Sequence, residues 1–246
     1  MTIVSKLVRA LALGTLIATA STAHSSIVIN GTRVIYNADE RETTTRLTNE
    51  NSYPVLIQAW ISATDKDDTP DKSSAPFVIT PPVAQIDSGK GQALRIMYTG
   101  APLPNDKESV FYLSVLEVPP RAAGAGSENL LQVALRTRIK LFYRPAGLPG
   151  SAAGAPTQLA WQLIALGANK GMALKASNPT AYYVSLGEVQ FNSAGHHYDA
   201  GSGMVAPGDS KTFPLKNLAA PAAGEVTFKS IDDYGSMVTG NQTIKP

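Results

Sequence analysis

The chain has 246 residues, no cysteine and a formal net charge of +2 at neutral pH. The lack of cysteine excludes disulfides, thiol nucleophiles and thiolate metal sites. Lys6 and Arg9 lie in residues 1–23, which contain no acid, and removing them from the 21 basic residues leaves 19, equal to the 19 acidic residues. Because a nucleic-acid-binding domain is expected to be basic, we expect no nucleic-acid partner.

Residues 1–23 predict a secretory signal peptide. The two basic residues precede an uncharged apolar run from Ala10 to Ala20, and the small residues Ser21-Thr22-Ala23 follow. These are the features of a cleaved signal, and the run is too short to span a bilayer. We therefore expect cleavage near His24 and a mature chain that works outside the cytoplasm; an uncleaved anchor is the alternative.

The rest of the chain predicts an all-β protein. Short segments rich in Val, Ile, Tyr, Trp and Thr alternate with turn residues, a pattern typical of antiparallel sandwiches. In chain order the expected strands are Ser26–Ile29, Thr32–Tyr36, Thr43–Thr48, Val55–Ser62, Ala93–Tyr98, Ser109–Val118, Leu131–Tyr143, Gln158–Ile164, Met172–Ala176, Ala181–Val189, Lys211–Leu215 and Glu225–Ile231.

A Pro/Gly/Ala-rich segment, PAGLPGSAAGAP at Pro145–Pro156, separates the two groups of strands and predicts a domain boundary. We expect an N-terminal sandwich over residues 24–146, a linker over 147–156 and a smaller C-terminal sandwich over 157–246.

The strand-like segment Asn129–Pro145, NLLQVALRTRIKLFYRP, is unusually long and apolar. One face carries Leu131, Val133, Leu135, Thr137, Ile139 and Leu141, and the other carries Gln132, Ala134, Arg136, Arg138 and Lys140. If its own domain covers only the C-terminal half of the apolar face, then Leu131, Val133 and Leu135 are available to bind another chain.

Candidate catalytic and metal-binding residues are scarce. His196 and His197 are adjacent, and neighbouring side chains on an extended chain point in opposite directions, so we expect exposed loop histidines. The acidic run Asp65–Asp68 lacks the glycine and terminal glutamate of an EF-hand loop. No G-x-S-x-G or similar nucleophile motif is present. We expect no enzyme activity, no cofactor and no metal.

Several motifs together resemble periplasmic pilus (fimbrial) chaperones of the chaperone–usher pathway. LPNDKESVFYLSVLEVPPR at Leu103–Arg121 resembles the family signature around the sixth strand of the first domain, except that Ser114 stands where the family usually has Asn or Cys. LQVALRTRIKLFYRP at Leu131–Pro145 resembles the seventh strand. Further matches are VITPPV, QAWI, NPTAYYV and IDDYG. The short segment Pro119–Glu128 and the lack of cysteine resemble the short-loop class.

The resemblance implies two Ig-like β-sandwich domains set at an angle, with a cleft between them, in the periplasm. It implies a chaperone that binds, folds and caps pilus subunits one-to-one by donor-strand complementation and delivers them to an outer-membrane usher. In that role Leu131, Val133 and Leu135 would insert into the open groove of the subunit.

The resemblance also assigns charged residues. Arg33 and Lys140 match paired cleft cations that hold the C-terminal carboxylate of the subunit. Glu108, Arg144 and Asp233 match a charge network that bridges the domains. Because an exposed sheet edge is a template for pairing, self-association of the empty chaperone is a further hypothesis.

Two other classes remain open at this point. A secreted structural subunit such as a pilin is the first, although its donor segment would be N-terminal and this apolar stripe is internal. An exported hydrolase is the second, and the absence of a plausible catalytic set argues against it.

Overall fold

The computed structural model of the chain describes residues 26–64, 69–120, 133–167, 171–218 and 220–244. The predicted signal peptide and Leu131 lie outside the described residues. In the part of the chain that the structure describes, no helix is long and apolar enough to cross a membrane.

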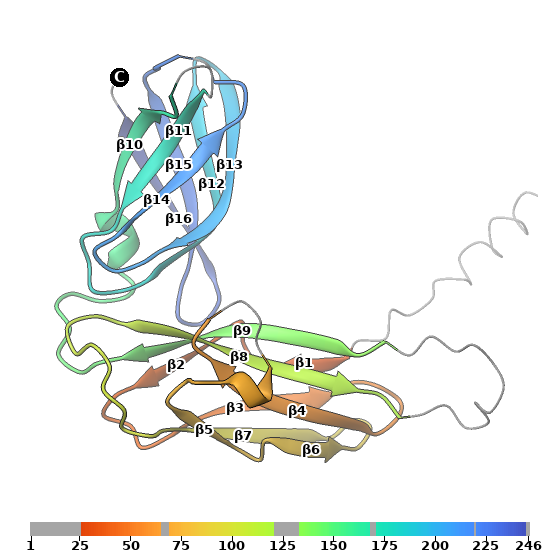
Figure 1. The fold of residues 1–246 in the computed structure, drawn as a ribbon. Helices are drawn as coiled ribbons and strands as arrows, with labels where there is room; N and C mark the ends of the chain where they lie inside the picture. Colours follow the sequence, from red (N-terminus) through yellow and green to blue (C-terminus); the bar gives the residue numbers. More distant parts are fainter. Residues whose placement is uncertain (1–25, 65–68, 121–132, 168–170, 219, 245–246) are drawn as a thin grey trace, which may run out of the picture.

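The first domain is a sandwich of two sheets with strand orders β1-β3-β7-β5 and β2-β9-β8-β4-β6 (Figure 1). The strands are β1 Ile27–Ile29, β2 Arg33–Asn37, β3 Thr43–Asn49, β4 Val55–Ser62, β5 Phe77–Thr80, β6 Val83–Ile86, β7 Gly91–Tyr98, β8 Ser109–Val118 and β9 Leu135–Arg144, with a 3-10 turn at Pro70–Lys72. Neighbouring strands are antiparallel except β2 and β9, which run parallel.

The core of the first domain lies between these sheets because alternate residues of each strand point inward. Leu47 and Leu94 come from one sheet, Leu113 and Leu141 come from the other, and all four are fully buried. Since Leu141 is a core residue, the C-terminal half of β9 is fixed to its own domain.

The second domain is also a two-sheet sandwich, with orders β10-β11-β14 and β13-β12-β15-β16. The strands are β10 Ala160–Ala165, β11 Met172–Ser177, β12 Val184–Ser193, β13 His196–Val205, β14 Ser210–Leu215, β15 Gly224–Ile231 and β16 Met237–Ile244, preceded by a 3-10 turn, η2, at Ala155–Gln158. Trp161, Phe191, Phe213 and Phe228 fill the core between the sheets. The prediction of two Ig-like sandwich domains is confirmed.

Four strands, β5, β6, β13 and β16, were not predicted from the sequence. β5 and β6 are short, and β13 and β16 carry glycines and exposed polar residues, so their hydrophobic alternation is weak. The expectation that His196 and His197 lie in a loop is wrong: both are exposed on β13, because this edge strand begins immediately after a tight turn at Gly195.

The domains lie at an angle and meet at the hairpin between β15 and β16, whose tip approaches the first domain beside β2 (Figure 1). Gly235 in this hairpin packs against Thr32, and a Cβ atom at Gly235 would lie 2.6 Å from the Thr32 hydroxyl oxygen. The Glu108 N–H also donates to the Ala181 carbonyl at 2.9 Å. These contacts hold the residues that precede β2 and β8 against the second domain.

Candidate functional site

β2 covers only part of one edge of β9. β8 pairs with β9 from Leu135 to Tyr143, whereas β2, on the other side, pairs with it only from Lys140 to Arg144. β2 therefore does not extend along the segment Leu135–Ile139 of β9. Backbone groups at a sheet edge can pair with another strand.

The apolar face of β9 changes from buried to exposed along the strand. Leu141 is fully buried and Ile139 packs against the core, but Leu135 is 50 % exposed and Val133, just before the strand, is 57 % exposed. Exposed large apolar side chains beside an open strand edge mark an interaction surface. The strand begins at Leu135 rather than at the predicted Leu131.

Arg33 and Lys140 lie next to each other where this open edge ends. They are direct partners in the parallel register of β2 and β9. Arg33 Nη1 donates to the Ile231 carbonyl at 2.8 Å, and Lys140 Nζ donates to Ser185 Oγ at 3.3 Å, so both cations reach the second domain. The buried Nε of Arg33 has no partner among the described residues.

The surroundings of Lys140 disfavour its positive charge. Burial lowers the pKa of Lys140, and the nearby charges of Arg33 and Lys211 lower the pKa further. Burial also lowers the pKa of Arg33, against the opposing effect of nearby acids led by Asp233. A carboxylate bound between Arg33 and Lys140 would relieve this repulsion, so the pair is suited to an anionic group.

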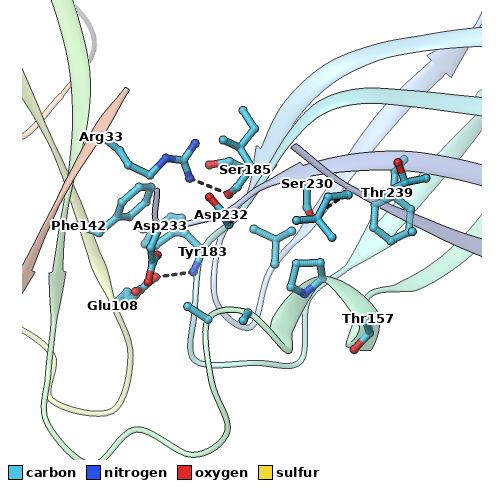
Figure 2. A pocket seen from close by; sticks show the side chains of 18 of the residues that line it. Arg33, Glu108, Phe142, Thr157, Tyr183, Ser185, Ser230, Asp232, Asp233 and Thr239 are labelled. Carbon is cyan, nitrogen blue, oxygen red and sulfur yellow. Dashed lines mark hydrogen bonds between the residues drawn. The ribbon is translucent and has the colours of Figure 1, made fainter. Parts of the chain in front are cut away.

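Glu108, Arg144 and Asp233 form one ion-pair network across the domain junction. Arg144 Nε lies 2.7 Å from Glu108 Oε1, and the two terminal nitrogens of Arg144 bond both Asp233 oxygens at 2.8 and 2.9 Å. Glu108 Oε2 also accepts the Tyr183 N–H at 2.8 Å (Figure 2). The network therefore joins the start of β8, the end of β9 and the β15–β16 hairpin.

Burial dominates the electrostatics of this network. The Glu108 side chain is only 2 % exposed, and burial raises its pKa despite the Tyr183 hydrogen bond and the Arg144 charge. Burial lowers the pKa of Arg144, but the hydrogen bonds and charges of Asp233 and Glu108 outweigh it, so the net pKa is raised. Arg144 is thus a permanent cation between two acids.

Some residues of this site carry no recognisable signal in the sequence. Ser185 and Ile231 hold the two cleft cations, and Lys211 on β14 adds a third positive charge near Lys140. Ile231 opens the IDDYG motif, but it acts through its backbone carbonyl, which any residue would supply. Ser185 and Lys211 act on Lys140 across the domain junction, which leaves no pattern in the sequence around them. Among the described residues, no group of three His, Asp or Glu could hold a metal ion.

Family comparisons agree with this geometry. Residues 26–149 match the N-terminal domain of PapD, a pili and flagellar-assembly chaperone, and residues 154–242 match the PapD C-terminal domain. The probable fimbrial chaperone YadV of Escherichia coli K12 is 40 % identical over 236 residues, covering 94 % of this chain and 95 % of the relative. The chaperone protein FimB/FhaD of Bordetella pertussis is 42 % identical over 234 residues, covering 94 % and 93 %.

Solved structures give the same result. The crystal structure of YadV has a TM-score of 0.76 at 40 % identity and covers 89 % of this chain and 100 % of that one. The Salmonella enterica SafB chaperone, solved in complex with the SafA pilin, has a TM-score of 0.74 at 27 % identity, covering 91 % and 99 %. The pilin and hydrolase alternatives do not fit this family. The chain therefore belongs to the PapD family of pilus-assembly chaperones and is a non-enzymatic fimbrial chaperone of the chaperone–usher pathway.

Proposed function

We propose that the chain captures pilus subunits one-to-one in the periplasm by adding the open edge of β9 to an incomplete subunit sheet, and then passes them to an outer-membrane usher. The observation that carries this proposal is that β2 stops at the Arg33–Lys140 pair, short of the part of β9 where Leu135 is exposed. Leu131, Val133 and Leu135 are the side chains that would enter the subunit groove.

The position of β2 sets the direction of an incoming strand. β2 begins at Arg33, opposite Lys140, and continues along the same edge of β9. A subunit strand at Leu135–Ile139 would therefore have one end against these two cations. If it runs parallel to β9, that end is its C-terminus and carries a carboxylate; if it runs antiparallel, an N-terminal ammonium could lie there and be repelled. The cations thus favour a parallel strand with its carboxylate at Arg33 and Lys140.

Anchoring the carboxylate also selects the register of the added strand. A slip of one residue would turn every groove-facing side chain to the opposite face. The present acceptors of the two cations, the Ser185 hydroxyl and the Ile231 carbonyl, are neutral groups. Charge-assisted hydrogen bonds to a carboxylate contribute about 1.5–3 kcal/mol each, which is more than neutral hydrogen bonds.

The apolar side chains supply the rest of the driving force. Full burial of a Leu or Val side chain contributes about 1.5–3 kcal/mol, so completing the burial of the half-exposed Leu135 and Val133 contributes roughly 1 kcal/mol each. The same edge in the empty chaperone is open to a second copy, and we propose weak self-association through it.

The Glu108–Arg144–Asp233 network supports the site by holding the interdomain angle. It keeps the second domain where Ser185 and Ile231 can reach the two cleft cations. If the network failed, the two halves of the anchor would separate while each sandwich kept its own core.

Export is the remaining part of the proposal. Residues 1–23 would act as a cleaved signal peptide and direct the mature chain to the periplasm. N-terminal sequencing of the protein purified from the periplasmic fraction tests this, because a start at Met1 would contradict cleavage.

The test of subunit capture is co-expression in the periplasm with a candidate subunit encoded at the same locus, followed by purification through a tag on the chaperone. We expect a soluble one-to-one complex that Lys140→Ala abolishes. Lys90→Ala, which removes an exposed lysine in the turn before β7, is the matched control and should retain the complex. A subunit that is stable and soluble alone and never co-purifies would contradict the proposal.

A further inference from the structure

A pocket of about 200 Å³ lies at the junction of the two domains, immediately beside the cleft cation Arg33 (Figure 2). Its apolar lining includes Phe142, Val184, Phe228, Ile231 and Val238. Arg33 and Ser185 also line it. A mainly apolar cavity with a few polar groups at one side is the usual form of a site for a small apolar group.

The pocket shares its rim with the carboxylate anchor. Ser185 accepts the hydrogen bond of Lys140 at 3.3 Å, and the Ile231 carbonyl accepts that of Arg33 at 2.8 Å. Both acceptor residues are pocket residues. A carboxylate held between Arg33 and Lys140 would therefore lie at the mouth of the pocket.

The direction of the added strand points toward the same place. A subunit strand parallel to β9 runs toward Phe142, which lies two residues beyond Lys140 on the same face of β9 and forms part of the pocket wall. Arg33 extends from the first domain toward the second at this point (Figure 2). A side chain on the last residue of that strand, if it is directed to this face, meets the pocket.

We propose that this pocket receives the side chain of the C-terminal residue of the subunit and selects an apolar or aromatic side chain there; the inference rests on the carboxylate anchoring proposed above. The size fits, because an apolar cavity of about 150 Å³ is enough to bind benzene. Of the two cations at the rim, Arg144 is paired with Glu108 and Asp233 and Arg33 would hold the terminal carboxylate, so neither is left for an acidic side chain.

The experiment uses the mature chaperone and short synthetic peptides that share one alternating body and differ only in the last residue. Gly, Leu, Phe and Asp would be compared with a free C-terminal carboxylate, together with the Phe peptide as its amide, by fluorescence anisotropy. Burying a large apolar side chain can raise the binding affinity by more than tenfold. We therefore expect the Phe and Leu peptides to bind at least about tenfold more tightly than the Gly peptide. The Asp peptide should show no such gain.

Two variants fill the pocket from different elements of the second domain, and one control does not. Val238→Trp on β16 and Thr157→Trp on η2 should reduce the Phe-to-Gly affinity ratio to near one. Thr243→Trp, on an exposed position of β16 outside the pocket, should retain the ratio. Circular dichroism melting checks that each variant is folded. If one filling variant does not fold, the other one carries the test.

The outcomes separate the two proposals. A ratio of about ten or more that both filling variants remove supports the pocket. Weaker binding of the amide with no effect of the last side chain overturns the pocket and leaves the carboxylate anchor in place. Equal binding of acid and amide, or no binding of any peptide, overturns the anchor and the pocket with it.

Discussion

The Glu108–Arg144–Asp233 network gives the sharpest quantitative prediction, which concerns Arg144→Ala. The variant leaves Glu108, whose side chain is 2 % exposed, with the Tyr183 N–H as its remaining partner. Breaking a buried ion pair by removing one partner costs about 3–5 kcal/mol. The surviving hydrogen bond places Glu108 at the lower end of that range.

The other contacts of Arg144 add less. Asp233 is 34 % exposed and can be hydrated again, so losing its pair costs about 1 kcal/mol or less. The Arg144 guanidinium also lies 5.5 Å from the Tyr182 ring centroid, a contact that contributes about 0.5–1 kcal/mol at a partly exposed site. We expect a total loss of about 3.5–5 kcal/mol.

Because Glu108 is buried at the domain junction, the chain can avoid most of this cost by letting the domains separate. The total loss is therefore limited by the free energy of the interface. We expect the two domains of the wild type to unfold together in denaturant and those of Arg144→Ala to unfold in two separate transitions. The radius of gyration of Arg144→Ala, measured by small-angle X-ray scattering, should also be larger than that of the wild type. Arg95→Ala is the control, since its pair with Glu42 is exposed, at 55 % and 37 %, and contributes at most about 1 kcal/mol.

The pH dependence adds an independent check. The pKa of Glu108 is raised by burial and would rise further without Arg144. Above its unfolded pKa the folded state then binds more protons than the unfolded state, so stability falls as the pH increases through the folded pKa. The loss of unfolding free energy in Arg144→Ala, relative to the wild type, should be larger at about pH 8 than at about pH 5. Adding Glu108→Gln to Arg144→Ala should reduce this loss. Coupled unfolding with unchanged stability at both values would refute the reasoning.

Three further predictions follow from the β9 edge and its anchor. Leu135→Glu should abolish the subunit complex, because a charge would enter an apolar groove. The variant should still elute as a folded monomer in size-exclusion chromatography. If the wild type also elutes as a monomer at every concentration, the proposed self-association through this edge is wrong. Subunit affinity should fall as the pH rises through a value below 10.5, since the pKa of Lys140 is lowered and only its charged form binds a carboxylate; affinity that is flat into the alkaline range would contradict the anchor. Arg33→Ala should weaken capture by roughly tenfold or more with little change in the melting temperature, because repulsion from Lys140 offsets the Ile231 hydrogen bond and the Phe142 ring contact that the variant loses. Calorimetry and binding measured on the same preparation check both parts.

The sequence predicts the features of this site that depend on local alternation. The alternation that puts Leu135, Ile139 and Leu141 on one side identifies the apolar face of β9. The length and apolar content of the segment indicate that part of this face binds another chain. Strands with weak alternation, such as β13 and β16, are not predicted in this way, because glycines and polar residues occupy their exposed faces.

Contacts between distant segments cannot be predicted from periodicity. The parallel pairing that sets Arg33 opposite Lys140 joins segments more than a hundred residues apart, and only the family resemblance suggested it. Ser185, Lys211 and the junction pocket result from the docking of two separately folded sandwiches, which leaves no local pattern in the chain.

The central claim is that a subunit strand adds to the open edge of β9. Backbone amide hydrogen exchange over Val133–Ile139, compared between the free chaperone and its subunit complex, tests it most directly. The account predicts strong new protection in this segment on binding, with little change from Lys140 to Tyr143, where both β2 and β8 pair with β9. A stable complex in which Val133–Ile139 exchanges as fast as in the free chaperone would contradict strand addition.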